Sequence, residues 1–151
     1  MTLFLVHHGD AVGPDVDPRR PLSDIGRAAV ALLADQAARR GAKPSVVWHS
    51  GKLRARQTAQ EYWRACNALA EFGATRDLQP EDQPVWMLDR LLGEARDIML
   101  VGHYPHMPAL HSLLVTGGIG SAQASFPQHG IVALESSDGG ETWRESWKLR
   151  S

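Results

Sequence analysis

Short apolar segments separated by helical patterns constrain the fold of this chain more than any other feature. Residues 2–6, 45–48 and 97–101 are mostly apolar, contain several β-branched side chains and show no alternation with polar residues. Such segments are typical of strands that are buried on both faces, as in parallel sheets covered by helices. We therefore expect these three segments to be central strands of one sheet.

The spacing of apolar residues between these segments predicts helices. Residues 24–40 have apolar side chains at helical spacing, with Ser23 as N-cap and Gly41 just after the last turn. Residues 131–135 and 142–149 look like two strands joined by a tight turn. The other predicted elements are helices over residues 52–70, 90–95 and 107–115. Together they predict a three-layer α/β/α sandwich, a mostly parallel sheet with a C-terminal hairpin, in a single domain over residues 1–151.

Composition excludes some classes of function. A formal net charge of -1 gives no overall field that would attract nucleic acid or a membrane surface. The leading apolar segment has about five residues, far fewer than the roughly 20 needed to span a bilayer. The single cysteine, Cys66, has no partner for an internal disulfide. By default we expect a cytoplasmic monomer that binds neither nucleic acid nor membrane.

Two histidines stand at the ends of predicted strands. His8 follows the first strand and precedes Gly9, and His103 follows the strand at residues 97–101, directly after Gly102. Ligand sites of open α/β sheets lie at the carboxyl ends of the strands. A neutral imidazole is a good nucleophile and proton carrier near pH 7. We therefore predict that His8 and His103 share a site.

Two arginines add positive charge near predicted helix starts. Arg20 shortly precedes one helix and Arg54 lies at the start of the next. A guanidinium group matches phosphate oxygens with two parallel hydrogen bonds, and a helix start adds unpaired N–H groups. Two arginines and two histidines predict an anion site, most naturally for a phosphoryl group.

The segments that carry these residues resemble a known family. They are LVHHGDA (5–11), RPLSDIG (20–26), SGKLRARQT (50–58) and LVGHYP (100–105). In this order and spacing they resemble the histidine phosphatase superfamily of phosphoglycerate mutase-like proteins, and most closely the SixA-type phosphohistidine phosphatases. The resemblance implies that His8 is a nucleophile that becomes phosphorylated, that Arg20 and Arg54 bind phosphate, and that His103 is the second pocket histidine. It implies no metal and no cofactor.

One residue departs from the family pattern. The family has arginine before the nucleophilic histidine, and this chain has His7. An imidazole replaces that cation only when protonated, and its ordinary pKa is about 6.5. We expect His7 to line the phosphate site, with weaker phosphate binding, a rate that rises toward acid, or loss of catalysis.

Larger relatives carry a glutamate that protonates an alcohol leaving group, whereas SixA-type members lack this acid. Asp89 and Glu94 are the candidates for a general acid in this chain. A phosphohistidine substrate needs such an acid less, because its imidazole leaves readily once protonated. We therefore expect a phosphohistidine-bearing protein as substrate.

Three alternatives stay open. The first is the phosphohistidine phosphatase, the second is a small-molecule phosphomonoesterase that uses Asp89 or Glu94 as acid, and the third is a weakly active pseudophosphatase that binds anions. Seven histidines also raise the question of a metal site, and His103 and His106 are three residues apart. No zinc-protease pattern is present, so we expect no metal and place His106 and His111 on helix surfaces.

Overall fold

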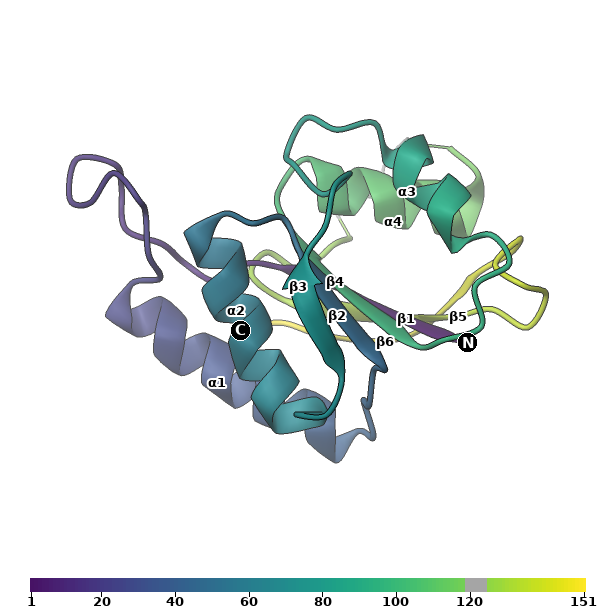
Figure 1. Cartoon of the computed structure of the whole chain (residues 1–151), viewed down its shortest axis with the longest axis horizontal. Coiled ribbons are helices and arrows are strands. Elements are labelled where there is room, and N and C mark those ends of the chain that lie inside the picture. The colour runs from purple at the N-terminus through teal and green to yellow at the C-terminus, as the bar shows by residue number, and fades with distance from the viewer. Residues whose placement is uncertain (119–124) are drawn as a thin grey trace.

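The computed structural model describes residues 1–118 and 125–151. These residues form a six-stranded sheet in the order β3-β2-β4-β1-β5-β6, with helices on both faces (Figure 1). In chain order the elements are β1 (Thr2–His7), α1 (Asp24–Arg39), β2 (Val46–His49), α2 (Leu53–Cys66), β3 (Glu71–Ala74), α3 (Pro84–Leu91), β4 (Ile98–Gly102), α4 (His106–Thr116), β5 (Ile131–Glu135) and β6 (Arg144–Leu149).

The sheet confirms the predicted mixture of parallel strands and a C-terminal hairpin. β1 to β4 are mutually parallel, β5 runs antiparallel to β1, and β6 runs antiparallel to β5. Leu5 in β1 therefore lies between Leu100 of β4 and Val132 of β5. Because β5 is reversed, its amino end lies at the same edge of the sheet as the carboxyl ends of β1, β2 and β4. We call this edge the carboxyl edge.

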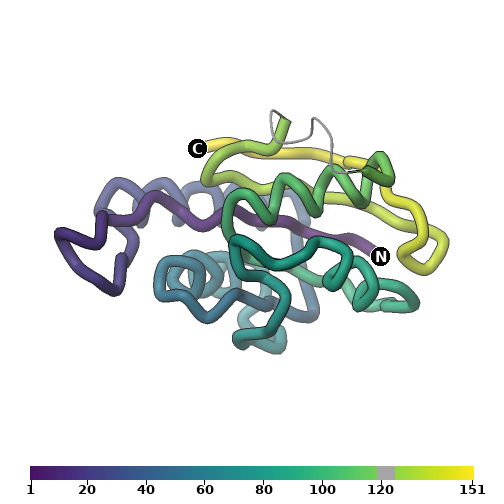
Figure 2. The backbone as a smooth tube through the Cα atoms, turned by 90° about the horizontal axis from the view of Figure 1, so that it is seen from above, coloured from purple at the N-terminus to yellow at the C-terminus, as the bar shows by residue number. Residues whose placement is uncertain are grey.

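Two apolar layers hold the helices against the sheet. Phe4 and Val6 pack with residues of α1 and α2, whereas Leu3 and Leu5 pack with residues of α3 and α4. This alternation follows from the two-residue period of a strand. In Figure 2 the purple β1 runs through the middle of the molecule, with the yellow C-terminal strands to one side. The carboxyl end of β1 is therefore held on both sides by neighbouring strands.

The first helix begins and ends as predicted. The Ser23 hydroxyl accepts a hydrogen bond from the Gly26 N–H (3.0 Å), and Gly41 follows the C-cap with a φ of 85°. Gly26 also lets the loop before the helix approach closely, because a Cβ there would lie 2.1 Å from the Asp10 carbonyl oxygen. The loop between β1 and α1, which carries Arg20, therefore packs closely against the first turn of α1.

The middle of the chain differs from the prediction. α2 ends at Cys66 because the Asn67 side chain donates to the Pro44 carbonyl (2.9 Å) and accepts from the Leu69 N–H (3.1 Å). The strand β3 follows, which was not predicted. The predicted helix at residues 90–95 is wrong, since the helix instead begins at Pro84, a residue favoured in a first turn. No described helix combines the length and apolar character that crossing a membrane requires.

Candidate active site

The carboxyl edge brings the two predicted strand-end histidines together. The His8 N–H donates to the Gly102 carbonyl (3.0 Å), so His8 and His103 follow neighbouring strands at the same level. Their ring centroids lie 5.0 Å apart, and both side chains are buried. His8 and His103 therefore lie together as predicted, and their chemical roles stay a prediction.

The His8 ring is held in a defined orientation. Its Nδ1 lies 2.7 Å from the Gly9 carbonyl oxygen, which can only accept, so Nδ1 carries the proton. The second ring nitrogen, Nε2, consequently has a free lone pair. Burial lowers the pKa of His8 to about 4, with Arg54 and Arg20 acting in the same direction and the bond to Gly9 opposing them. His8 is thus a neutral imidazole at neutral pH.

Arg54 and Arg20 provide positive charge beside these rings. Arg54 lies in the first turn of α2, and its buried Nε has no hydrogen-bond partner among the described residues. Burial and the neighbouring Arg20 lower the pKa of Arg54. Within residues 1–118 and 125–151, neither guanidinium forms an ion pair with a carboxylate. Two neighbouring guanidinium groups without a counter-ion make a site for an anion.

Arg20 is fixed by its backbone. It has a φ of 51°, which is uncommon for a residue other than glycine, and its Nε donates to the Val12 carbonyl (3.1 Å). The loop therefore turns at Arg20 and directs its charge to the pocket, where that charge lowers the pKa of His8. Backbone outliers of this kind concentrate at functional sites.

His103 is tied to the end of β2. Its Nε2 lies 2.7 Å from the Ser50 hydroxyl, and its buried Nδ1 has no partner among the described residues. Burial, followed by the charges of His8 and Arg54, lowers the pKa of His103 to about 3. The ring is therefore neutral and keeps one unused nitrogen beside the nucleophile candidate.

His7 lies in the same cluster, and burial keeps its ring neutral, which answers the question of charge that the sequence left open. Burial lowers the pKa of His7 to about 2, with the surrounding histidines and Arg54 adding to the effect. Its ring centroid lies 4.5 Å from that of His8 and 4.4 Å from that of Tyr104. His7 is therefore neutral in the folded protein, and the expected rise in rate toward acid does not follow from it.

His129 is a member of the cluster that the sequence argument missed. Its main-chain N–H donates to Nδ1 of His7 (2.7 Å), and the two rings stack at 4.6 Å with planes 10° apart. Its own Nδ1 donates to the His8 carbonyl (2.6 Å). His129 precedes Gly130 and the reversed strand β5, and it has a φ of 56°. The sequence carried only a partial signal for it, a histidine beside a glycine, because this histidine stands before a strand and not after one.

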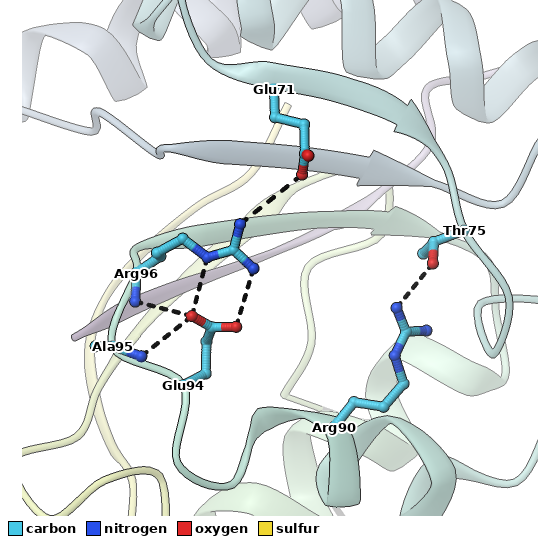
Figure 3. A network of polar contacts seen from close by, with 6 residues as sticks. All are labelled: Glu71, Thr75, Arg90, Glu94, Ala95 and Arg96. Atoms are coloured by element: carbon cyan, nitrogen blue, oxygen red, sulfur yellow. Dashed lines mark hydrogen bonds and ion pairs between the residues drawn. The ribbon is translucent and has the colours of Figure 1, made fainter.

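The two candidate acids lie elsewhere. Asp89 is exposed on α3, which covers a face of the sheet. Glu94 lines a cavity with Met1 at the amino end of β1, the end opposite to His8. Its carboxylate binds the guanidinium of Arg96 at 3.0 Å (Figure 3), and these bonds lower the pKa of Glu94 to about 2. Glu94 is therefore a charged partner of Arg96, and the structure contradicts its role as the acid.

Two further histidines are also placed differently from the prediction. His106 and His111 on α4 are buried, with 1% and 4% of their surface exposed. α4 packs against both α3 and β1, so it has little free surface. Nε2 of His111 lies 3.0 Å from a carboxylate oxygen of Glu145 on β6. Both histidines are thus packed residues of the fold.

Comparison with solved structures identifies the fold. A protein histidine phosphatase SixA complexed with tungstate superposes with a TM-score of 0.85 at 23% identity, covering 99% of this chain and 97% of that one. The SixA protein of Agrobacterium tumefaciens gives a TM-score of 0.79 at 28% identity, with the same coverage. The chain has the histidine phosphatase fold.

The same fold is shared by enzymes of other names. A mycobacterial glucosyl-3-phosphoglycerate phosphatase superposes with a TM-score of 0.70 at 15% identity, over 99% of both chains. No family model and no curated protein sequence matches the chain. The histidine phosphatase fold is therefore recognised from three-dimensional structure together with the four sequence segments.

Proposed function

We propose that this protein is a phosphatase that transfers a phosphoryl group to Nε2 of His8 and then to water. The observation that carries the proposal is the pairing of a free lone pair on His8 with two guanidinium groups that lack carboxylate partners among the described residues. The likeness to phosphatases of the histidine phosphatase fold supports it, as does the tungstate, a tetrahedral oxyanion, in one of them. Phosphohistidine is the substrate class that we favour.

In the first step, Nε2 of His8 attacks phosphorus in line with the leaving group. The bond from phosphorus to Nε2 forms as the bond to the leaving nitrogen or oxygen breaks. The Gly9 carbonyl keeps the proton of His8 on Nδ1, so the attacking nitrogen does not need to lose a proton. The positive charge that forms on the ring is spread toward this carbonyl.

The negative charge of the transferred group is stabilised by donors around it. We assign the equatorial oxygens to the guanidinium groups of Arg54 and Arg20 and to His103. His7 adds a neutral donor, because its Nδ1 accepts the His129 N–H and its ring proton therefore stands on Nε2. A neutral donor is weaker than the arginine of the family, but it works without an acidic medium.

In the second step, water attacks the phosphorylated His8. Its oxygen bonds to phosphorus, the bond from phosphorus to Nε2 breaks, and phosphate leaves with the proton of the water passing to solvent or to phosphate. Glu94 lies at the amino end of β1, opposite to His8, and Asp89 is exposed on α3; both observations support a substrate whose leaving group is an imidazole.

The test is phosphate release from a phosphohistidine-bearing protein, compared with release from para-nitrophenyl phosphate. We expect release from phosphohistidine, preference over the ester, and loss of at least about a thousandfold in His8→Asn. Preference for the ester would overturn the substrate class. Absence of release from both substrates, with vanadate still bound, would replace catalysis by the pseudophosphatase alternative. Large activation by His7→Arg would show that the natural residue impairs the enzyme.

A further inference from the structure

We propose that His8, His129 and His7 form a binding site for a divalent ion of the zinc class, and that this ion inhibits the enzyme by occupying the nucleophile. Each of these residues offers a ring nitrogen, and the three nitrogens lie within 4.8 Å of one another. Imidazole is a preferred ligand of zinc. The effect on activity rests on the function proposed above, whereas binding of the ion does not.

Two of the three rings have the tautomer that a metal ligand needs. Nδ1 of His8 donates to the Gly9 carbonyl (2.7 Å), and Nδ1 of His129 donates to the His8 carbonyl (2.6 Å). Zinc-bound histidines almost always donate their other ring N–H to a carbonyl, a carboxylate or water in this way. The Nε2 lone pairs of His8 and His129 are therefore available and their rings are already oriented.

His7 is the third ligand and has to adjust. Its lone pair stands on Nδ1, which accepts the main-chain N–H of His129 (2.7 Å), so the ring must release this bond to coordinate an ion. Two nitrogens bound to one zinc at about 2.1 Å are about 3.4 Å apart. The ring nitrogens of the cluster lie within 4.8 Å of one another, so the side chains must come closer together when an ion binds, and His7 moves most because it gives up its bond to His129.

The charge around the site determines how the ion acts. Arg54 lies close enough to lower the pKa values of both His7 and His8, so its charge opposes a bound cation. We therefore expect binding on the order of micromolar rather than nanomolar affinity. Once bound, the ion holds the Nε2 lone pair of His8, which can then no longer attack phosphorus. The ion is thus a reversible inhibitor and takes no part in the reaction.

Direct binding tests the site without substrate. The protein is freed of metal with a chelator, transferred to chelator-free buffer and titrated with zinc chloride in a calorimeter, and with cobalt chloride while visible absorption is recorded. We expect one ion per chain and at least tenfold weaker binding in His129→Ala and in His7→Arg. His49→Asn is the matched control, because His49 is a buried histidine at the same edge whose Nδ1 accepts only the Gly51 N–H (3.0 Å). The His49→Asn variant should bind zinc with the same affinity as the natural protein.

Activity provides the second readout. Zinc should inhibit phosphate release in the natural protein and in His49→Asn, and His7→Arg should be active but insensitive to zinc at the same concentrations. Equal zinc affinity in the natural protein, His129→Ala and His7→Arg would overturn the site. If His129→Ala does not fold, as judged by circular dichroism, His129→Gln takes its place. Zinc binding without any phosphatase activity would overturn the proposed function and leave the metal site standing.

Discussion

Lowering the pH from 7 to 5 should destabilise this protein strongly, because its clustered histidines are buried in the neutral form. Burial and neighbouring charges lower the pKa values of His7, His8 and His103 to about 2, 4 and 3. In the unfolded chain each returns to about 6.5. At pH 5 the unfolded chain therefore binds protons that the folded protein does not, and stability falls as the pH falls through 6.5.

The size of the effect follows from these values. Each of the three histidines contributes about 2 kcal/mol of destabilisation between pH 7 and pH 5, or about 5 to 6 kcal/mol together. His49, His106 and His111 also have pKa values lowered by burial and act in the same direction. A domain of this size has a free energy of unfolding of about 5 to 15 kcal/mol, so the loss is a large part of the total.

Urea unfolding followed by tryptophan fluorescence at pH 7, 6 and 5 measures the effect, with EDTA present to remove metal ions. The free energy of unfolding should decrease at each step. In His103→Asn the same pH change should cost about 2 kcal/mol less, whatever the variant's stability at pH 7. Equal stability of the natural protein at pH 7 and pH 5 would refute the argument, because it would mean that these imidazoles bind protons in the folded state.

Three other predictions concern single positions. His7→Gln, which keeps a donor near the place of Nε2, should lower kcat by no more than about tenfold, whereas His7→Asn should lower it by about a hundredfold; equal rates in steady-state assays would exclude His7 as a donor. Gly26→Ala should lose about 3 kcal/mol in urea unfolding because of the close Asp10 carbonyl, while Gly118→Ala, with open space around it, should lose less than about 1 kcal/mol. Glu94→Gln should leave kcat within about twofold, since it lies at the other end of the sheet, and a larger loss would restore it as an acid.

The sequence predicted those elements whose signal is local. Apolar runs predicted β1, β2 and β4 within two residues, and Ser23 and Gly41 predicted the ends of α1. β3 has no such run, since its four residues include only one large apolar side chain, Phe72. Its extended form comes from pairing with β2, a neighbour that a local pattern does not reveal. Helix α3 was predicted at the wrong residues for another reason. Pro84 is a helix-start signal, but it stands at the end of a turn-rich stretch, where a proline is also typical of a turn.

The residues of the candidate site also differ in whether their position has a local signal in the sequence. His8 and His103 could be predicted because each closes an apolar strand of its own. His129 could not be placed by the same rule, since it stands before a strand, and only the reversed direction of β5 brings it to the carboxyl edge. The charge of His7 was beyond the sequence as well, because it depends on burial among other imidazoles. Glu94 failed as a candidate acid because the resemblance indicated only a region of the sequence, and the fold places this residue at the amino end of β1.

The position of β1 has a consequence for how the chain folds during synthesis. β1 is made before both of its partners, β4 and β5, which lie about 90 and 130 residues later in the sequence. One hydrogen-bonding edge of this apolar strand therefore stays unpaired until β4 has been made, and the other edge stays unpaired until β5 has been made. Closure of such long loops is slow, and exposed strand edges favour association with other chains. A ribosome carrying a partly made chain should thus expose the segment around His8, which gains its pocket only after β4 and β5 have been made.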